Sequence, residues 1–150
     1  MARDEGVRRE VLADLSAVAE LARLIAPALR PGDQLALNGP MGSGKTTFVR
    51  ALVEALGGDP ACVSSPTFTL LHRYQARLPV IHVDACRLDG WPQLAALGVD
   101  DDIAADGVLA VEWADRVAEA LTPTWRLVFA HAAVGRVVEI AGPLRQNPVR

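Results

Sequence analysis

The sequence predicts an α/β protein, a three-layer sandwich around a central, mostly parallel sheet. Three observations carry this prediction. Residues 34–38 form an apolar strand that runs directly into a glycine-rich loop, and a helical pattern follows that loop. Two later apolar runs, 79–83 and 108–111, end in Asp84 and Glu112. Because the carboxyl ends of parallel strands meet at one edge, we expect the loop and both carboxylates to line one ligand site.

The remaining elements follow from apolar spacing and turn residues. Residues 14–29 predict a helix, because Val18, Leu21 and Ile25 fall on one face. Gly57 and Gly58 should end the helix that starts after the loop. The other expected elements are a polar loop over 64–69, an irregular or short helical segment over 93–106, a helix over 114–121, and strands over 125–129 and 134–140 joined near Gly135. The last two strands predict a C-terminal antiparallel extension of the sheet.

Composition narrows the class of protein. The chain has 150 residues, 51% of them hydrophobic and 22% charged, so we expect one globular domain over 1–150. The net charge of −3 provides no basic footprint for independent binding to nucleic acid. With only Cys62 and Cys86, no signal-peptide pattern and no membrane-spanning run, the expected location is the cytoplasm, without a membrane role.

The glycine-rich loop carries the most specific chemistry. Residues 39–46 read GPMGSGKT and match the P-loop pattern G-x-x-x-x-G-K-[ST] between a strand and a helix. Lys45, the only lysine of the chain, should contact the β- and γ-phosphates, and the Thr46 hydroxyl should ligate Mg²⁺. We therefore predict binding of ATP with magnesium. The residues expected to contact the nucleotide are Gly39, Met41, Gly42, Ser43, Gly44, Lys45, Thr46 and Thr47.

Hydrolysis needs a carboxylate at the metal and a group that responds to the γ-phosphate. Asp84 and Glu112 are the candidates for the carboxylate, although one of them could merely cap a helix. Thr67, in Ser65-Pro66-Thr67, lies where related NTPases have a switch loop, but Pro66 could equally set an ordinary turn.

Other polar residues give weaker signals. The three histidines, His72, His82 and His131, show no metal-ligand spacing and are expected to be packed or at the surface. Trp113 should lie near the nucleotide because it directly follows Glu112.

Taken together, these segments resemble the TsaE (YjeE) family, small bacterial ATPases of tRNA threonylcarbamoyladenosine synthesis. The resemblance covers about residues 14–141 and depends on the order of five motifs. They are Gly39 to Thr47, SPTFTL at 65–70, HVD at 82–84 with Arg87-Leu88, LGVD at 97–100, and VEWA at 111–114. The SPTFTL and VEW segments are far more specific than the P-loop alone.

The resemblance implies a P-loop NTPase fold and weak ATP hydrolysis that is activated by partners. Those partners would be TsaB and TsaD, a heterodimer that transfers a threonylcarbamoyl group to the adenosine beside the tRNA anticodon, so tRNA contact would be indirect. It also implies that Thr46 and Glu112 ligate Mg²⁺, that Asp84 is an essential carboxylate nearby, and that Ser65-Pro66-Thr67 is the switch loop. The residues expected to act in catalysis are Lys45, Asp84, Glu112 and Thr67. Arg87, retained from the family pattern, is a candidate for stabilising charge in the transition state.

Two other functions remain open from the residues themselves. A small-molecule P-loop kinase would need an arginine-rich lid, and the arginines here are scattered. A nucleotide-dependent binding module that never hydrolyses ATP would not need both Asp84 and Glu112.

Overall fold

The fold is described from a computed structural model, which covers residues 7–65, 71–96, 98–99 and 106–143. Thr67 and the acidic run 100–102 lie outside the described residues. Within the described ranges, no helix has the length and apolar character needed to cross a membrane.

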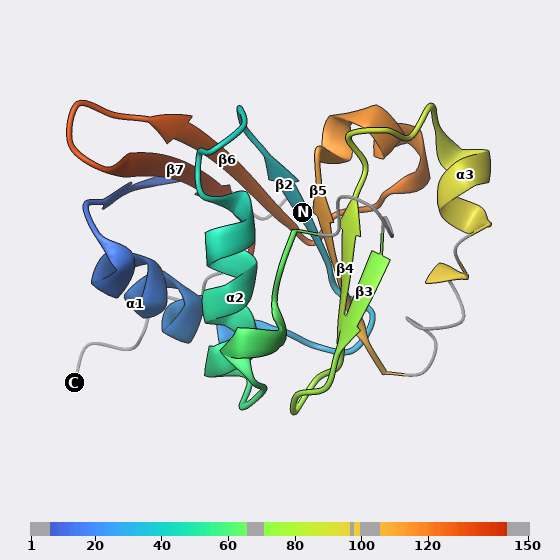
Figure 1. The fold of residues 1–150 in the computed structure, drawn as a ribbon, viewed down its shortest axis with the longest axis horizontal. Coiled ribbons are helices and arrows are strands. Elements are labelled where there is room, and N and C mark those ends of the chain that lie inside the picture. The colour runs from blue at the N-terminus through green and yellow to red at the C-terminus, as the bar shows by residue number, and fades with distance from the viewer. Residues whose placement is uncertain (1–6, 66–70, 97, 100–105, 144–150) are drawn as a thin grey trace, which may run out of the picture.

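A seven-stranded sheet forms the centre of the molecule, in the order β1-β7-β6-β2-β5-β4-β3 (Figure 1). Strands β4, β5, β2 and β6 run parallel, whereas β3, β7 and β1 pair antiparallel at the two sides. The bounds are β1 Arg8–Leu12, β2 Gln34–Asn38, β3 Leu71–Tyr74, β4 Val80–Asp84, β5 Val108–Glu112, β6 Trp125–His131 and β7 Arg136–Ala141. This arrangement confirms the predicted α/β class with a parallel centre and a C-terminal antiparallel extension.

Alternation along the strands divides the core into two clusters, one on each face of the sheet. Leu35, Leu37 and Ala110 pack with helices α1 (Leu15–Ile25) and α2 (Lys45–Ala55), which lie beside each other in Figure 1. Ala36, Leu109 and Val111 belong to the second cluster, which includes Leu94 of α3 (Trp91–Ala95) and two residues of the 3₁₀ segment η3 (Ala114–Ala120). Helical segments therefore cover both faces, as in a three-layer sandwich.

Several elements differ from their predictions for local reasons. The first helix ends at Ile25 rather than 29 and continues as a 3₁₀ turn, η1 (Ala26–Ala28), because Pro27 cannot donate a backbone hydrogen bond. The predicted helix over 114–121 is the 3₁₀ segment η3, which is interrupted at Val117 by a non-helical φ of −128°. A second short 3₁₀ turn, η2 (Pro60–Cys62), follows α2.

Strands β1 and β3 were not predicted from the sequence. Both lie at an edge of the sheet, and most of their side chains are polar or charged, as in RREVL and LHRY. Such segments lack the apolar pattern that identifies a strand, since an edge strand needs only one partner and little burial. Their pairing with β7 and β4 therefore reflects tertiary structure.

Candidate functional site

The P-loop connects β2 to α2 and has a backbone shape that only glycine readily adopts. Gly39, Gly42 and Gly44 have φ angles of +147°, +73° and +109°. A Cβ added at Gly39 would lie 2.5 Å from the carbonyl oxygen of Phe129 and 2.7 Å from Ser43 Oγ. The loop is thus closed tightly against β6, which leaves its concave side for a ligand.

Lys45, the first residue of α2, is 5% exposed and is directed back over the loop. Its Nζ donates hydrogen bonds to the carbonyl oxygens of Gly39 (2.5 Å) and Pro40 (3.0 Å). Burial lowers the pKa of the Lys45 ammonium, and the negative charges of Glu112 and Asp84 partly oppose this shift. The ammonium is therefore held at the mouth of the loop, beside two carboxylates.

Trp113 also packs on this ammonium, with Lys45 Nζ 4.3 Å from the ring centroid. Its backbone has a φ of +58°, in the left-handed region that side chains other than glycine rarely adopt. A conformation of this kind costs about 1–3 kcal/mol and commonly occurs at functional sites. The bend turns the chain sharply after Glu112 and brings the indole against the P-loop lysine.

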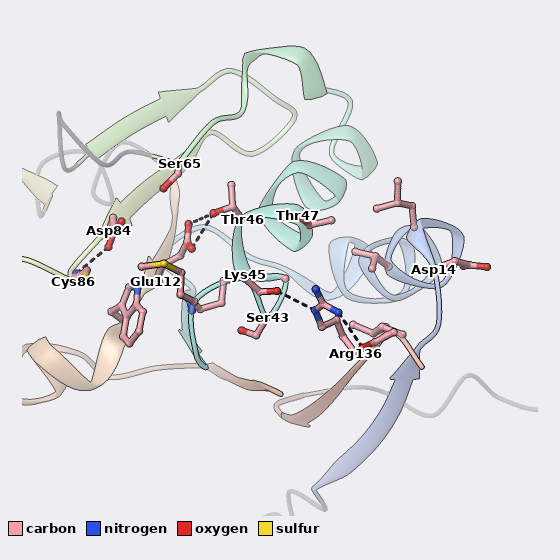
Figure 2. A pocket seen from close by; sticks show the side chains of 18 of the residues that line it. Asp14, Ser43, Lys45, Thr46, Thr47, Ser65, Asp84, Cys86, Glu112 and Arg136 are labelled. Atoms are coloured by element: carbon pink, nitrogen blue, oxygen red, sulfur yellow. Dashed lines mark hydrogen bonds between the residues drawn. The ribbon is translucent and has the colours of Figure 1, made fainter. Parts of the chain in front are cut away.

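Thr46 and Glu112 meet at the carboxyl ends of the parallel strands. The Thr46 hydroxyl lies 3.0 Å from Glu112 Oε1 and 2.9 Å from Oε2, and Glu112 is only 4% exposed (Figure 2). Asp84 pairs in register with Glu112 on the adjacent strand and accepts a hydrogen bond from the Cys86 amide (2.9 Å). The two predicted metal ligands, Thr46 and Glu112, therefore lie together, and the sheet places the Asp84 carboxylate beside Glu112.

These oxygens suit a hard cation such as Mg²⁺, which prefers oxygen ligands and keeps several waters. Within the described residues, no group of three or more His, Cys, Asp or Glu residues could hold a metal unaided. Magnesium at this site would thus need ligands from Thr46, Glu112, water and a bound phosphate. A metal that arrives with its nucleotide meets this requirement.

The concave side of the loop opens into a pocket of about 720 Å³, large enough for a nucleotide. Ser43 Oγ is buried without a hydrogen-bond partner in the described part of the chain, which costs free energy unless a ligand supplies one. Met41 lines the pocket and is 80% exposed. The loop residues Met41, Gly42, Ser43, Gly44, Lys45, Thr46 and Thr47 all line this pocket, together with Ser65, Asp84, Arg87, Glu112 and Trp113.

Two groups at the site were missed by sequence reasoning. His82, expected only to be packed or at the surface, is fully buried with its Nε2 2.5 Å from Glu112 Oε2. His82 and Asp84 are two apart on one strand, so alternation alone would have placed them on the same face. Arg136, from β7, donates from Nε to the Gly42 carbonyl (3.0 Å), and no pattern in the sequence connects these distant residues.

The fold and the site define this chain as a P-loop α/β domain. The family model described as "Threonylcarbamoyl adenosine biosynthesis protein TsaE" matches residues 12–138. The chain belongs to this family of tRNA threonylcarbamoyladenosine biosynthesis proteins, as its motifs predicted.

Individual relatives support the same assignment. A TsaE protein of Bacillus subtilis is 40% identical over 67% of this chain and 63% of its own length. A TsaE protein of Streptomyces coelicolor is 41% identical over 69% of this chain and 71% of its own. Matches to two Rickettsia relatives span 59% and 61% of their lengths, so the chain aligns with about three-fifths of several relatives. The crystal structure of YdiB from Bacillus subtilis has a TM-score of 0.72 and 29% identity, covering 91% of this chain and 86% of that one.

Proposed function

We propose that this chain binds ATP with Mg²⁺ in its P-loop and hydrolyses it. The observation that carries the proposal is the meeting of a buried ammonium, a hydroxyl and a carboxylate at the mouth of the loop, from Lys45, Thr46 and Glu112. A further support is the Ser43 hydroxyl of that loop, which is buried and has no hydrogen-bond partner among the described residues. A phosphate chain would provide acceptors for the ammonium and the hydroxyl.

Each group would have a separate task. Lys45 would exchange its bonds to the Gly39 and Pro40 carbonyls for phosphate oxygens and balance their charge. Thr46 and Glu112 would hold Mg²⁺, which neutralises charge on the phosphates when it is bound. Asp84, within the same pocket, would orient water at the metal or at the phosphate. Thr67 stays a predicted γ-phosphate contact.

The cellular role we propose follows from family membership. ATP hydrolysis by this chain would support threonylcarbamoyl transfer to the adenosine beside the tRNA anticodon, in a complex with TsaB and TsaD. The net charge of −3 favours indirect contact with tRNA through these partners. The expected site of action is the cytoplasm.

The test is phosphate release from ATP by the purified chain, alone and with TsaB, TsaD and a substrate tRNA. We expect Mg²⁺-dependent release that is slow alone and stimulated by the partners. The Lys45→Ala variant, assayed with the same partners, controls for their own activity. Absence of stimulation would remove the proposed partnership. Transfer of phosphate to an added nucleoside or sugar would instead identify a small-molecule kinase, and nucleotide binding without turnover would identify a binding module.

A further inference from the structure

A chain of buried hydrogen bonds leads away from Glu112 across three neighbouring strands. His82 on β4 contacts Glu112 on β5 through Nε2 (2.5 Å), and its Nδ1 lies 3.1 Å from the hydroxyl of Tyr74 on β3. The Tyr74 hydroxyl also lies 3.2 Å from the carbonyl oxygen of Ser64, beside the pocket-lining Ser65. Glu112, His82 and Tyr74 are all buried, so water competes little for these bonds.

Strand alternation explains why these side chains meet. Ala110 and Glu112 point to the α2 face of the sheet, and Val80, His82 and Tyr74 share that face. Every other buried residue of β4 except Asp84 is aliphatic, so His82 brings a polar ring into an otherwise apolar part of the strand. The imidazole contacts the Glu112 carboxylate through one ring nitrogen and the Tyr74 hydroxyl through the other.

The direction of the bonds follows from the chemistry of the groups. A carboxylate only accepts hydrogen bonds, so His82 Nε2 must donate to Glu112. A neutral imidazole protonated at Nε2 accepts at Nδ1. The single proton of the Tyr74 hydroxyl is then shared between His82 Nδ1 (3.1 Å) and the Ser64 carbonyl oxygen (3.2 Å). His82 contacts Oε2 of Glu112, whereas the Thr46 hydroxyl lies within 3.0 Å of both carboxylate oxygens. The carboxylate is thereby held by His82 on one oxygen while both oxygens face the Thr46 hydroxyl.

We propose that His82 is a positioning residue for Glu112 and that Tyr74 holds His82, so that this chain orients the carboxylate for Mg²⁺. The inference rests on the proposed Mg²⁺-dependent ATP site and deepens it. A Thr46 hydroxyl that ligated Mg²⁺ through an oxygen lone pair would still have only one proton to donate to Glu112. His82 supplies this carboxylate with a second donor, on Oε2. Partners behind a metal ligand commonly contribute about 10–100-fold to metal affinity or activity.

Two substitutions of His82 distinguish the role of its Nε2 atom from that of its Nδ1 atom. In His82→Gln the side-chain amide nitrogen can occupy the place of Nε2 and keep the bond to Glu112. In His82→Asn the amide lies near the place of Nδ1 and loses that bond. The probe is ADP affinity measured by calorimetry while Mg²⁺ is varied, which requires no turnover. We expect His82→Asn to raise by about 10–100-fold the Mg²⁺ concentration at which the change in ADP affinity is half-maximal. Metal-free ADP affinity should stay within about twofold.

His82→Gln should recover most of the wild-type Mg²⁺ dependence, and Tyr74→Phe should shift it by about 3–10-fold, the loss of one hydrogen bond. Ile81→Val is the matched control, because Ile81 is buried beside His82 on the same strand but belongs to the core cluster of the other face. Two results would show that His82 has only a structural role. One is an equal change of the Mg²⁺ dependence in His82→Gln and His82→Asn, and the other is a change in Ile81→Val as large as that in His82→Asn. Unchanged Mg²⁺ dependence in His82→Asn would overturn the proposal.

A second measurement does not depend on nucleotide. In the nucleotide-free protein, nitrogen NMR should find His82 protonated at Nε2 with slow proton exchange, and Tyr74→Phe should shift the Nδ1 resonance. A ring protonated only at Nδ1 would contradict the assigned bonds. If wild-type protein binds no ADP, the proposed function fails, and the NMR result still decides the His82–Glu112 bond. If the His82→Asn variant does not fold, the His82→Gln and Tyr74→Phe variants decide the outcome. A wild-type Mg²⁺ dependence in Tyr74→Phe would count against the proposed chain of hydrogen bonds.

Discussion

The P-loop is held from two sides, and the two sides differ in kind. On the β3–β5 side, buried side chains bond to one another, from Tyr74 through His82 to Glu112 and Thr46. On the β6–β7 side the contacts are to the loop's own backbone: Arg136 donates to the Gly42 carbonyl, and the Phe129 carbonyl packs against Gly39. Figure 2 shows Glu112 and Arg136 on opposite sides of Lys45.

The difference indicates a division of labour. Side chains held in a dry network keep a fixed orientation, which metal binding and proton transfer require. Backbone contacts carry no chemistry of their own, but they set the curvature that directs the loop amides toward a phosphate. We infer that the β3–β5 side serves chemistry and that the β6–β7 side serves the shape of the loop.

The strongest test removes Lys45, which lies between these two sides in Figure 2. In Lys45→Ala the ammonium and its charge-assisted bonds to phosphate are gone, so ADP affinity should fall by at least about 100-fold. Calorimetry measures the affinity, and thermal unfolding checks that the fold is kept. Lys45→Arg should not restore binding, because a planar guanidinium does not fit a buried point-charge site. Affinity within about threefold of wild type in Lys45→Ala would refute the phosphate role.

A substitution at Gly39 disrupts the close approach of the P-loop to β6. Gly39→Ala places a Cβ 2.5 Å from the Phe129 carbonyl at a φ of +147°, so the free energy of unfolding should drop by about 2–5 kcal/mol and nucleotide binding should be lost. Urea unfolding measures the change. Gly32→Ala is the control, since Gly32 has a φ of +89° but no described residue has an atom within 4 Å of its added Cβ. It should cost only the backbone strain, about 1–2 kcal/mol. Equal losses would mean that the close approach to β6 is unimportant.

A substitution of Arg136 also tests the β6–β7 side, and its expected effect is smaller. Arg136→Ala removes the bond to the Gly42 carbonyl while the buried network stays complete, so ADP affinity should weaken by about 3–10-fold. The Mg²⁺ dependence of that affinity should not change, which separates this variant from those at His82. Arg126→Ala, an exposed arginine on neighbouring β6, is the matched control for the loss of one positive charge. A changed Mg²⁺ dependence in Arg136→Ala would argue against the division of labour.

The smallest predicted effect tests whether water is excluded from the buried hydrogen bonds on the β3–β5 side. Burial, the largest cause, raises the pKa of Tyr74, the only tyrosine in the chain, so tyrosinate absorbance reports this one group. The native protein should ionise above the usual value of about 10, and the urea-unfolded protein near it. As pH rises past about 10, the unfolded chain loses this proton first, so stability should fall. Tyr74→Phe should lack this part of the alkaline loss. Equal native and unfolded midpoints would show that water reaches the network.

Much of this site was predictable because local chemistry specifies it. The spacing of Gly39, Gly44, Lys45 and Thr46 identifies a phosphate loop from consecutive residues alone. Buried strands that end in Asp84 and Glu112 predicted that the two would meet, since parallel strands present their carboxyl ends together, and they pair in register. The family followed from the same motifs. These predictions needed only short-range pattern and the geometry of a parallel sheet.

Other features were decided only when distant segments packed together. Strands β1 and β3 carry no apolar signature and exist because β7 and β4 offer them an edge. The bond from Arg136 to Gly42 joins residues far apart in the chain, and no local pattern specifies it. His82 reads as a core residue until β3, β4 and β5 lie side by side and place it between Tyr74 and Glu112. Sequence therefore determined which groups form the loop and the proposed phosphate site, through local backbone geometry, and tertiary packing decided what holds those groups in place.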